Sequence, residues 1–263
     1  MPIGISFIVP AFNEEALLGA TLEALREAGR ALGEPYEILV VDDASTDLTA
    51  DIARHHEARV VSVNCRHIAG TRNAGAREAT GQMFVFVDAD TIVSSEVTLA
   101  AVAAVRAGAV GGGSALKFDG VIPLFARVIT PFAVWLLRIF RVAPGCFLFC
   151  SRKAFFAVGG FDETFFGAED VVLSNALKQY GRFEILRQAV TTSGRKLRTH
   201  SVLEMLYLLL RLTVRGTRVI KQRQGMELWY GERREEGGAP GSERIRAAPD
   251  GGTRNGDRTD GPG

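Results

Sequence analysis

The chain has 263 residues, 47% of them hydrophobic, and its 31 basic and 30 acidic residues give a formal net charge of +1. This length suits one α/β domain or two small ones, and so balanced a charge does not favour nucleic acid as a partner. Three cysteines do not make a disulfide framework, and the first residues show neither the basic segment nor the cleavage site of a signal peptide. We therefore expect a cytoplasmic protein.

The first half of the chain alternates between strand and helix patterns. Apolar strands are predicted at residues 5–9, 36–41, 59–63 and 82–87. Helices are predicted between them, at residues 14–31, from a cap at Thr46 or Asp47 through His56, and at residues 71–79. Strands this apolar, separated by helices, indicate an α/β fold whose mostly parallel sheet is covered on both faces.

The second half is less regular. A helix at residues 96–106 leads to a Gly-rich strand at 109–118, another strand is predicted at 145–151, and a helix follows Glu169. Between the two strands, a helical pattern at 121–141 has an apolar stripe made of Phe125, Val128, Ile129, Phe132, Trp135, Leu136 and Ile139, with Arg127, Val134, Arg138 and Arg141 roughly opposite. From Glu232 onward little can be buried, and residues 231–263 are predicted to be a disordered tail.

Basic residues gather late in the chain. Eight Lys or Arg residues lie between Arg195 and Arg223, against one acid, Glu204. Such a basic stripe suits an anionic ligand or an anionic membrane surface, and a solvated helix face is the alternative. Because no apolar stretch reaches the roughly 18 residues of a spanning helix, only peripheral membrane contact is expected.

Polar and acidic residues follow three of the predicted strands. These strand ends read "PAFNEE", "DDAST" and "DADT". Ligands of open α/β sheets bind beyond the carboxyl ends of the strands, so the three ends together predict a binding site. Asp47 is an exception, because its position before a predicted helix is typical of a cap.

The tripeptide Asp88-Ala89-Asp90 places two like charges two residues apart. Something must compensate this repulsion, and a divalent cation would do so. Mg²⁺ and Mn²⁺ take oxygen ligands and commonly bridge one or two carboxylates to substrate phosphates. The pattern therefore predicts a Mg²⁺ or Mn²⁺ site at the end of the fourth strand.

Four segments in this order resemble the successive motifs of the family 2 glycosyltransferases: "FIVPAFNEEALLGATLEAL", "EILVVDDASTDLTADIA", "GTRNAGAREATGQMFVFVDADT" and "GGFDETFFGAEDVVLSNALKQYG". The resemblance covers about residues 3–187. It implies the GT-A fold, which is Rossmann-like, followed by a helical C-terminal segment and the tail. It also implies one domain at 1–230, with a nucleotide-binding half at about 1–92 and an acceptor-side half at about 93–230.

The resemblance further implies a nucleotide-diphosphate-sugar donor of the UDP or GDP type. The positions that match the cradle of the base and ribose are Pro10, Ala11, Asn13 and Glu14. Asp43 matches the residue that hydrogen-bonds the base, which leaves Asp42 as a structural partner at the strand end. Arg72 matches a basic residue near the nucleotide. Pairing with the nearby acidic cluster is the alternative for this arginine.

The chemistry implied by the resemblance rests on four carboxylates. Asp88 would contact the ribose or the metal, and Asp90 would ligate the ion that bridges the diphosphate. Glu169 and Asp170 match the family's Glu-Asp pair, in which the aspartate acts as general base on the acceptor hydroxyl. Direct displacement would then invert the anomeric centre.

The match weakens after residue 187. His200, Arg195 and Lys196 are candidates for contact with the metal or the diphosphate, and a surface position is the alternative for His200. The QxxRW motif of polysaccharide synthases is absent, because Glu227 stands before Leu-Trp where Arg-Trp would be needed. That absence argues against a processive polysaccharide synthase.

Several alternatives stay open. A non-catalytic nucleotide-sugar-binding protein would share the fold, whereas a nucleotidyltransferase or phosphatase is disfavoured because "PAFNEE" lacks the Asp or the basic Gly-rich loop that those enzymes place there. The acceptor is a hydroxyl group of unknown identity. Residues 121–140 and 195–223 would suit a lipid-linked acceptor at the inner face of the membrane, or they pack as domain core.

Overall fold

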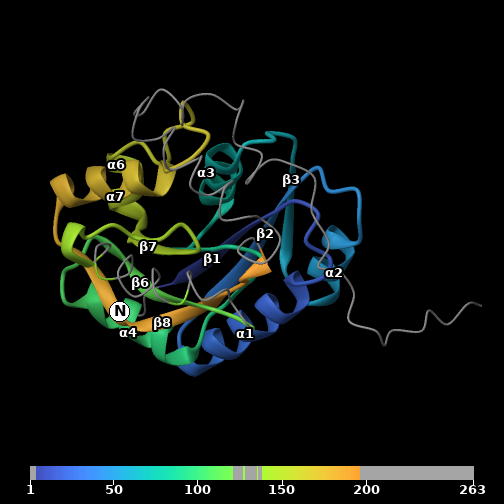
Figure 1. The fold of residues 1–263 in the computed structure, drawn as a ribbon, viewed down its shortest axis with the longest axis horizontal. Helices are drawn as coiled ribbons and strands as arrows, with labels where there is room; N and C mark the ends of the chain where they lie inside the picture. The colour runs from blue at the N-terminus through green and yellow to red at the C-terminus, as the bar shows by residue number, and fades with distance from the viewer. Residues whose placement is uncertain (1–3, 121–126, 128–134, 136–137, 196–263) are drawn as a thin grey trace, which may run out of the picture.

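The computed structural model of this chain describes residues 4–120, 127, 135 and 138–195 (Figure 1). The predicted disordered tail, the helical C-terminal segment, His200, Lys196 and the basic stretch beyond Arg195 lie outside these residues. Of the apolar stripe predicted at 121–141, the described part includes only Trp135 and Ile139.

The described residues form one eight-stranded sheet with the strand order β3-β2-β1-β4-β7-β6-β8-β5. The strands are β1 (Ile5–Ala11), β2 (Tyr36–Asp43), β3 (Arg59–Val63), β4 (Met83–Val87), β5 (Thr91–Ile92), β6 (Gly111–Phe118), β7 (Phe147–Ser151) and β8 (Phe183–Thr192). The first four strands pair in parallel, whereas β7 pairs antiparallel to both β4 and β6. The sheet is therefore mixed, with a parallel first half.

Helices cover both faces of this sheet (Figure 1). On one face, α1 (Leu18–Leu32) and α4 (Ser95–Arg106) bury apolar residues against a core that includes Phe7 and Phe147. On the other face, α3 (Ile68–Glu78), α6 (Arg152–Ala157) and α7 (Glu169–Tyr180) enclose a second core that includes Phe84 and Phe86. The short α2 (Thr49–His55) lies between β2 and β3. None of the described helices is both long and apolar enough to cross a membrane.

The predicted strands are confirmed, but two helices begin elsewhere than predicted. Helix α1 begins at Leu18 instead of residue 14, because Asn13 has a left-handed backbone (φ 52°) and the residues after it form turns. Helix α3 begins at Ile68 because His67 caps it, its Nδ1 accepting a hydrogen bond from the Gly70 amide at 3.2 Å. The sequence did not predict α6, β5 or β8.

Close packing of α3 on the sheet positions the residues of the site described below. A Cβ atom on Gly75 would lie 2.5 Å from Cγ2 of Ile8 and 2.7 Å from Cγ2 of Val41, both on buried strands. Helix α3 can therefore approach β1 and β2 only with glycine at this position.

We predict that Gly75→Ala lowers the free energy of unfolding by about 1–2 kcal/mol, since the overpacking outweighs the better helix propensity of alanine. Urea denaturation measures the change. Arg77→Ala, at an exposed position of the same helix, is the control and should leave the midpoint nearly unchanged. Equal midpoints for the two variants would contradict the close approach.

Candidate active site

Acidic residues from two distant segments meet around one arginine of α3. Nη2 of Arg72 donates hydrogen bonds to Oδ1 of Asp88 at 2.8 Å and to the carbonyl of Gly145 at 2.9 Å. Nη1 of Arg72 donates to Oε1 of Glu169 at 2.6 Å. The turn after β4 and the first turn of α7 are thus joined through one guanidinium.

Arg72 is buried, with 3% of its surface exposed, and its Nε has no hydrogen-bond partner among the described residues. Burial disfavours the charged form of Arg72, but the charges of Asp88 and Glu169 outweigh this effect and raise its pKa. The ring of Phe161 lies 5.3 Å from the guanidinium carbon. Pairing with the acidic cluster, the alternative considered for this arginine, is therefore what the structure shows.

Asp170 belongs to the same cluster. Its Oδ2 lies close to both Gly145 and Arg72, since a Cβ on Gly145 would be 3.1 Å from Oδ2 and 3.7 Å from Nη2 of Arg72. Burial, and after it the charge of Glu169, raises the pKa of Asp170 from 3.8 to about 7, although Arg72 and the Val171 amide act in the opposite direction. A carboxyl group whose pKa is raised in this way is suited to accept a proton near neutral pH.

Asp90 lies where β5 meets the end of β8. Its Oδ1 accepts longer contacts from the hydroxyls of Thr91 at 3.4 Å and Thr192 at 3.5 Å, and its carbonyl accepts from the Ser193 amide at 3.1 Å. Asp88 and Asp90 are therefore held by different partners, the first by Arg72 and the second by the β8 end.

No group of three or more His, Cys, Asp or Glu side chains that could hold a metal occurs among the described residues. Two carboxylates nevertheless fit Mg²⁺ or Mn²⁺, which usually keep waters and take substrate phosphates to complete their shells. Asp88 and Asp90 carry hard oxygen atoms of the kind that these ions prefer.

The loops after β1 and β2 are bonded to each other. Oδ1 of Asn13 accepts from the Thr46 amide at 2.8 Å, and the Asn13 amide donates to the Ser45 hydroxyl at 3.0 Å. Oδ1 of Asp47 accepts from the Thr49 amide at 3.0 Å, but the N-cap residue of α2 is Leu48, so the cap predicted at Thr46 or Asp47 lies one or two residues too early. Pro10 and Ala11 end β1 directly before this loop.

Asp43 is fixed more firmly than Asp42. Its carboxylate accepts hydrogen bonds from the amides of Cys65, Arg66 and His67 at 2.7, 2.9 and 3.2 Å, and from the hydroxyl of Thr71 at 3.0 Å. The only hydrogen bond recorded for the Asp42 side chain, among the described residues, is from the Ser45 amide at 3.2 Å. The bond from Ser45 agrees with the structural part that the sequence assigned to Asp42, and Asp43 has a structural part as well, because it ties β2 to the start of α3.

Glu14 and Arg195 connect the two ends of the described chain. Nη2 of Arg195 lies 3.1 Å from Oε2 and 3.4 Å from Oε1 of Glu14, and the glutamate is 6% exposed. The ion pair therefore places Arg195, which follows β8, beside the loop after β1. Of the late basic residues proposed for the diphosphate, this is the one that the structure describes.

Sequence reasoning missed Asn73. Its Nδ2 donates to the Phe161 carbonyl at 2.8 Å and to Oε1 of Glu163 at 2.9 Å, while its Oδ1 accepts from the Phe161 amide at 2.9 Å. These bonds fasten the "GGFDE" turn, which precedes Asp170, to α3. The position beside Arg72 in "GTRNAG" was the only available signal, and it says nothing about the partner.

Residues 6–155, more than half of the chain, match the family model described as glycosyl transferase family 2. The chain belongs to this family. The predicted resemblance is thereby confirmed over the segments that carry β1, α3 and β4.

Named relatives of this family member are similar over part of their length. Validoxylamine A glucosyltransferase of Streptomyces hygroscopicus subsp. jinggangensis is 34% identical over 107 residues, which cover 38% of this chain and 25% of the relative. An undecaprenyl-phosphate 4-deoxy-4-formamido-L-arabinose transferase of Pectobacterium carotovorum is 32% identical over 93 residues, or 33% of this chain and 28% of the relative. The alignments thus span about a quarter of the length of these curated relatives.

Solved structures confirm the predicted GT-A type of α/β fold. The mannosyltransferase PcManGT from Pyrobaculum calidifontis, solved in complex with GDP-Man and Mn²⁺, superposes with a TM-score of 0.62 at 21% identity. The match covers 84% of this chain and 63% of that protein. At this level of identity the likeness concerns the fold alone.

We predict strong energetic coupling between Arg72 and Glu169. Arg72→Met should lower the free energy of unfolding by about 3–5 kcal/mol, because it leaves buried carboxylates without their counter-charge. Adding Glu169→Gln removes part of that repulsion, so the double variant should lose less than the sum of the two single losses.

A double-mutant cycle in urea measures this coupling, expected at about 1–3 kcal/mol. The exposed ion pair of Arg54 and Asp51 on α2 is the matched control, with an expected coupling below about 1 kcal/mol. Equal coupling in the two cycles would refute the role of Arg72 as the central counter-charge.

The raised pKa of Asp170 predicts a pH-dependent cost to stability. The folded state holds this proton up to about pH 7 while the unfolded state releases it near pH 3.8, so the stability of the native protein falls between these values as pH rises. Asp170→Asn has no proton to lose. In metal-free buffer, the free energy of unfolding of this variant should exceed that of the native protein by an amount that grows to about 2–4 kcal/mol between about pH 4 and pH 8.

Thermal denaturation of both proteins across this pH range measures the gain. Asp51→Asn, at an exposed position of α2, is the control and should show a small, pH-independent difference from the native protein. A pH-independent difference for Asp170→Asn would contradict the raised pKa.

Proposed function

We propose that this family 2 chain transfers a sugar from a nucleotide-diphosphate sugar, of the UDP or GDP type, to an acceptor hydroxyl. One observation carries the proposal. Arg72 bonds both Asp88, which follows β4, and Glu169, whose neighbour Asp170 has a pKa raised to about 7. A proton acceptor next to ligands for a cation is the combination that glycosyl transfer from a diphosphate requires.

Asp88 and Asp90 are the residues that would hold Mg²⁺ or Mn²⁺. A bound divalent cation supplies Lewis-acid stabilisation of the negative charge on the departing nucleoside diphosphate. The Mn²⁺ in the Pyrobaculum mannosyltransferase supports this choice of metal by analogy. In this chain, Arg72 keeps the Asp88 carboxylate in place and Thr192 contacts that of Asp90.

Asp170 is the proposed base. As the acceptor oxygen bonds to the anomeric carbon, the bond from that carbon to the diphosphate oxygen breaks and the hydroxyl proton passes to a carboxylate oxygen of Asp170. Attack opposite the leaving group inverts the anomeric centre. Glu169, predicted as the second member of the pair, is bonded to Arg72 and acts in this proposal by positioning the first turn of α7.

The nucleotide side of the proposal uses the loops after β1 and β2. Pro10, Ala11, Asn13 and Glu14 would border the base and ribose, and Asp43 would keep its predicted place near the base. Asn13, Glu14 and Asp43 already bond within the protein, so their proposed role is to shape this border through backbone as well as side-chain atoms. Arg72 is too deeply buried to be proposed as a direct nucleotide contact.

The acceptor side is proposed from the relatives and the second half of the chain. The relative named undecaprenyl-phosphate 4-deoxy-4-formamido-L-arabinose transferase favours a lipid-linked acceptor, which the protein would meet at the inner face of the membrane. We also propose that residues 1–230 form one domain, since the sheet continues from its parallel half into β6, β7 and β8 without a break. Lys196 and His200 keep their place as candidates near the diphosphate.

A non-catalytic protein that binds nucleotide sugars is the second candidate. It would share the fold and the carboxylates after β4, but its function would not require a proton acceptor with a pKa near 7. The two candidates therefore differ at Asp170 and agree at Asp90, which makes this pair of residues the test.

We predict that Asp170→Asn impairs transfer and that Asp90→Ala impairs donor binding. Asp170→Asn should bind the donor normally but lose at least about a hundredfold in transfer rate, because the hydroxyl keeps its proton. Asp90→Ala should lose the Mn²⁺-dependent part of donor binding. A thermal-shift panel of UDP- and GDP-sugars with and without Mn²⁺ identifies the donor, since a ligand of the folded state raises its stability.

Transfer to an acceptor panel and hydrolysis of the donor are then measured for both variants and for Asp51→Asn as a surface control. Full turnover by Asp170→Asn would remove this residue as the base. Donor binding without turnover by the native protein on every acceptor would favour the second candidate, and undiminished Mn²⁺-dependent binding by Asp90→Ala would remove the metal role.

A further inference from the structure

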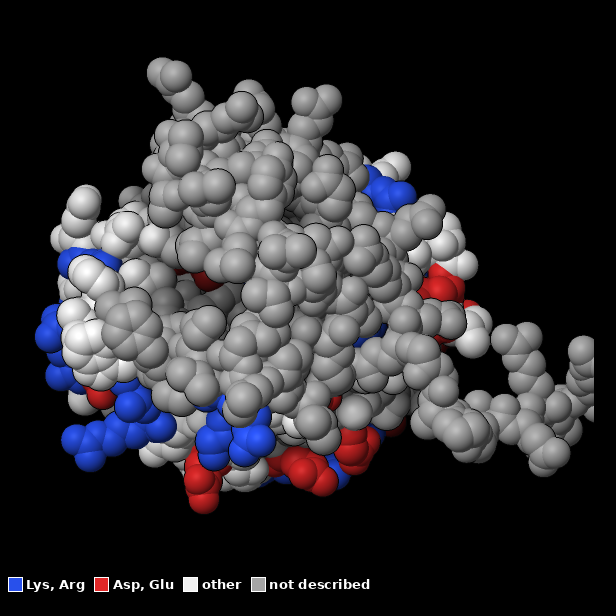
Figure 2. Space-filling model, in the orientation of Figure 1, with Lys and Arg blue, Asp and Glu red and all other residues white. Residues whose placement is uncertain are grey.

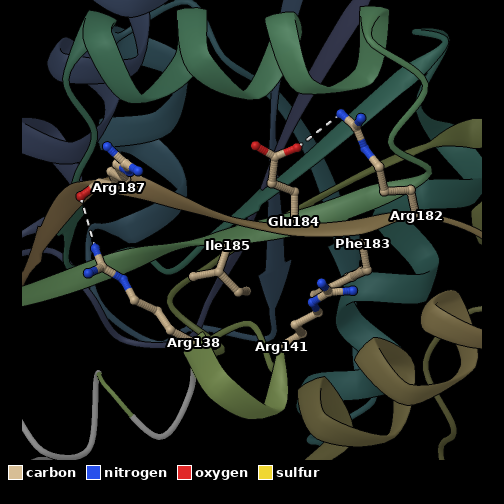
Figure 3. Close-up of a pocket in the computed structure, with 7 residues that line it drawn as sticks. All are labelled: Arg138, Arg141, Arg182, Phe183, Glu184, Ile185 and Arg187. Atoms are coloured by element: carbon tan, nitrogen blue, oxygen red, sulfur yellow. Dashed lines mark hydrogen bonds and ion pairs between the residues drawn. The ribbon is translucent and has the colours of Figure 1, made fainter.

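A pocket of about 420 Å³ opens beside β8, and none of the proposed catalytic or nucleotide-binding residues lines it (Figure 3). Its lining contains four arginines, Arg138, Arg141, Arg182 and Arg187, together with Phe183, Glu184 and Ile185. The one carboxylate, Glu184, pairs with Arg182 at 3.1 Å. Three arginines therefore exceed the acidic charge of the lining.

The pocket is built on a sheet edge. Strand β8 pairs with β6 on one side, while β5 reaches only Thr191 and Thr192 on the other, so residues 183–190 have no second strand beside them in the described part of the chain. Nη2 of Arg138 donates to the carbonyl of Arg187 at 3.2 Å, which Figure 3 shows as a side chain reaching up to the strand. The Arg138 side chain thus bonds one backbone carbonyl on this edge, where a neighbouring strand could otherwise pair.

The backbone that carries two of these arginines is fixed. Nζ of Lys178 on α7 donates to the carbonyl of Phe140 at 2.8 Å, and the Arg141 amide donates to the Arg138 carbonyl at 3.2 Å. Arg141 itself has a left-handed backbone with φ 50°, a conformation that few non-glycine residues adopt. Residues in rare backbone conformations are common at ligand-binding sites, so the conformation of Arg141 favours a ligand in this cationic pocket.

Large apolar side chains are exposed in the segment that leads to Arg141 of the pocket. Trp135 and Ile139 are each 54% exposed and Phe140 is 63% exposed, within one six-residue span that ends beside Arg141. Figure 2 shows basic side chains, with acidic ones next to them, along the edge where β8 and α4 run in Figure 1. Aromatic and aliphatic side chains beside arginines are the composition of surfaces that lie at the boundary between lipid headgroups and acyl chains.

We propose that this pocket binds the phosphate of an anionic phospholipid headgroup while Trp135, Ile139 and Phe140 enter the interface, so that the protein docks on an anionic membrane through the β8 edge. The charge of the lining favours this occupant, because the described lining has three more arginines than carboxylates and such a lining prefers a phosphate to a neutral or cationic group. The neighbouring apolar side chains favour a lipid over a soluble phosphate, which would leave them in water. The proposal does not depend on the reaction assigned to the protein.

Docking at this place would bring the candidate active site close to the lipids. Arg141 precedes Gly145, whose carbonyl accepts from Arg72, by four residues. Four residues span at most about 14 Å. A membrane surface at Arg141 therefore lies near the acidic cluster.

Vesicle flotation tests the proposal with the full chain. The native protein should float with vesicles of phosphatidylcholine and phosphatidylglycerol, less so at higher salt, and not with phosphatidylcholine alone. Replacing Arg138, Arg141 and Arg187 by glutamine should weaken this partition by about fivefold per arginine, on the order of a hundredfold in all. Replacing the exposed Arg30, Arg77 and Lys153 by glutamine removes the same charge elsewhere and should change it by less than about tenfold.

The tryptophan beside the pocket gives a second measurement. In a Trp229→Phe background, Trp135 should shift to shorter wavelength with anionic vesicles and be quenched by lipids brominated near the headgroup. Equal flotation of the pocket variant and its control, or no quenching of Trp135, would overturn the proposal. Phosphate or glycerol 3-phosphate that stabilises the native protein but not the pocket variant, without vesicle binding, would identify a soluble ligand and overturn it too.

Discussion

A permanently charged guanidinium, buried between three elements, is the constraint on which the candidate active site depends. Arginine cannot release its proton in a protein, so Arg72 must be compensated wherever the chain buries it. Its partners come from the end of β4 and the start of α7, and Glu169 is 97 residues away in sequence. The fold must therefore bring α3, β4 and α7 together, or leave a buried charge unpaired.

The single positive charge of Arg72 faces more than one carboxyl group. Asp88, Glu169 and Asp170 lie around Arg72, so the carboxyl groups outnumber the guanidinium. Burial first, and then the charge of Glu169, raises the pKa of Asp170 and favours its protonated form. The Asp-Ala-Asp turn shares this excess of negative charge. Internal compensation by Arg72 and the proposed affinity for a divalent cation are thus compatible, because the guanidinium satisfies only part of the carboxylate charge.

The parallel half of the fold could be predicted because buried parallel strands read as nearly continuous apolar runs, as β1, β2 and β4 do. Strand β8 escaped prediction because it alternates irregularly between buried and exposed positions along an open sheet edge. The late start of α1 also had no local signal, since it depends on bonds from Asn13 to a loop 33 residues further on. Local sequence carries periodicity, whereas these features depend on distant partners.

The candidate site shows the same division. Strand ends and motif order identified Asp88, Asp90 and Asp170, because a ligand site on an open α/β sheet lies beyond the carboxyl ends of its strands. Sequence could place Arg72 near these acids but not choose between a nucleotide and the acids as its partner. Asn73 was invisible for a related reason, since its two bonds to Phe161 join segments 88 residues apart.

The segment 141–146 connects the cationic pocket with the acidic cluster of the candidate active site. It begins with Arg141 in the cationic pocket and ends with Gly145 and Cys146, whose carbonyls accept from Arg72 and from the Asp88 amide. A side chain at Gly145 would press on Asp170, so this end tolerates little displacement. A ligand at the other end can influence the cluster only if its contacts differ between two positions of the segment. The arrangement therefore favours a model in which the acidic cluster is already formed and docking only orients it toward the membrane. It disfavours a model in which docking assembles the cluster.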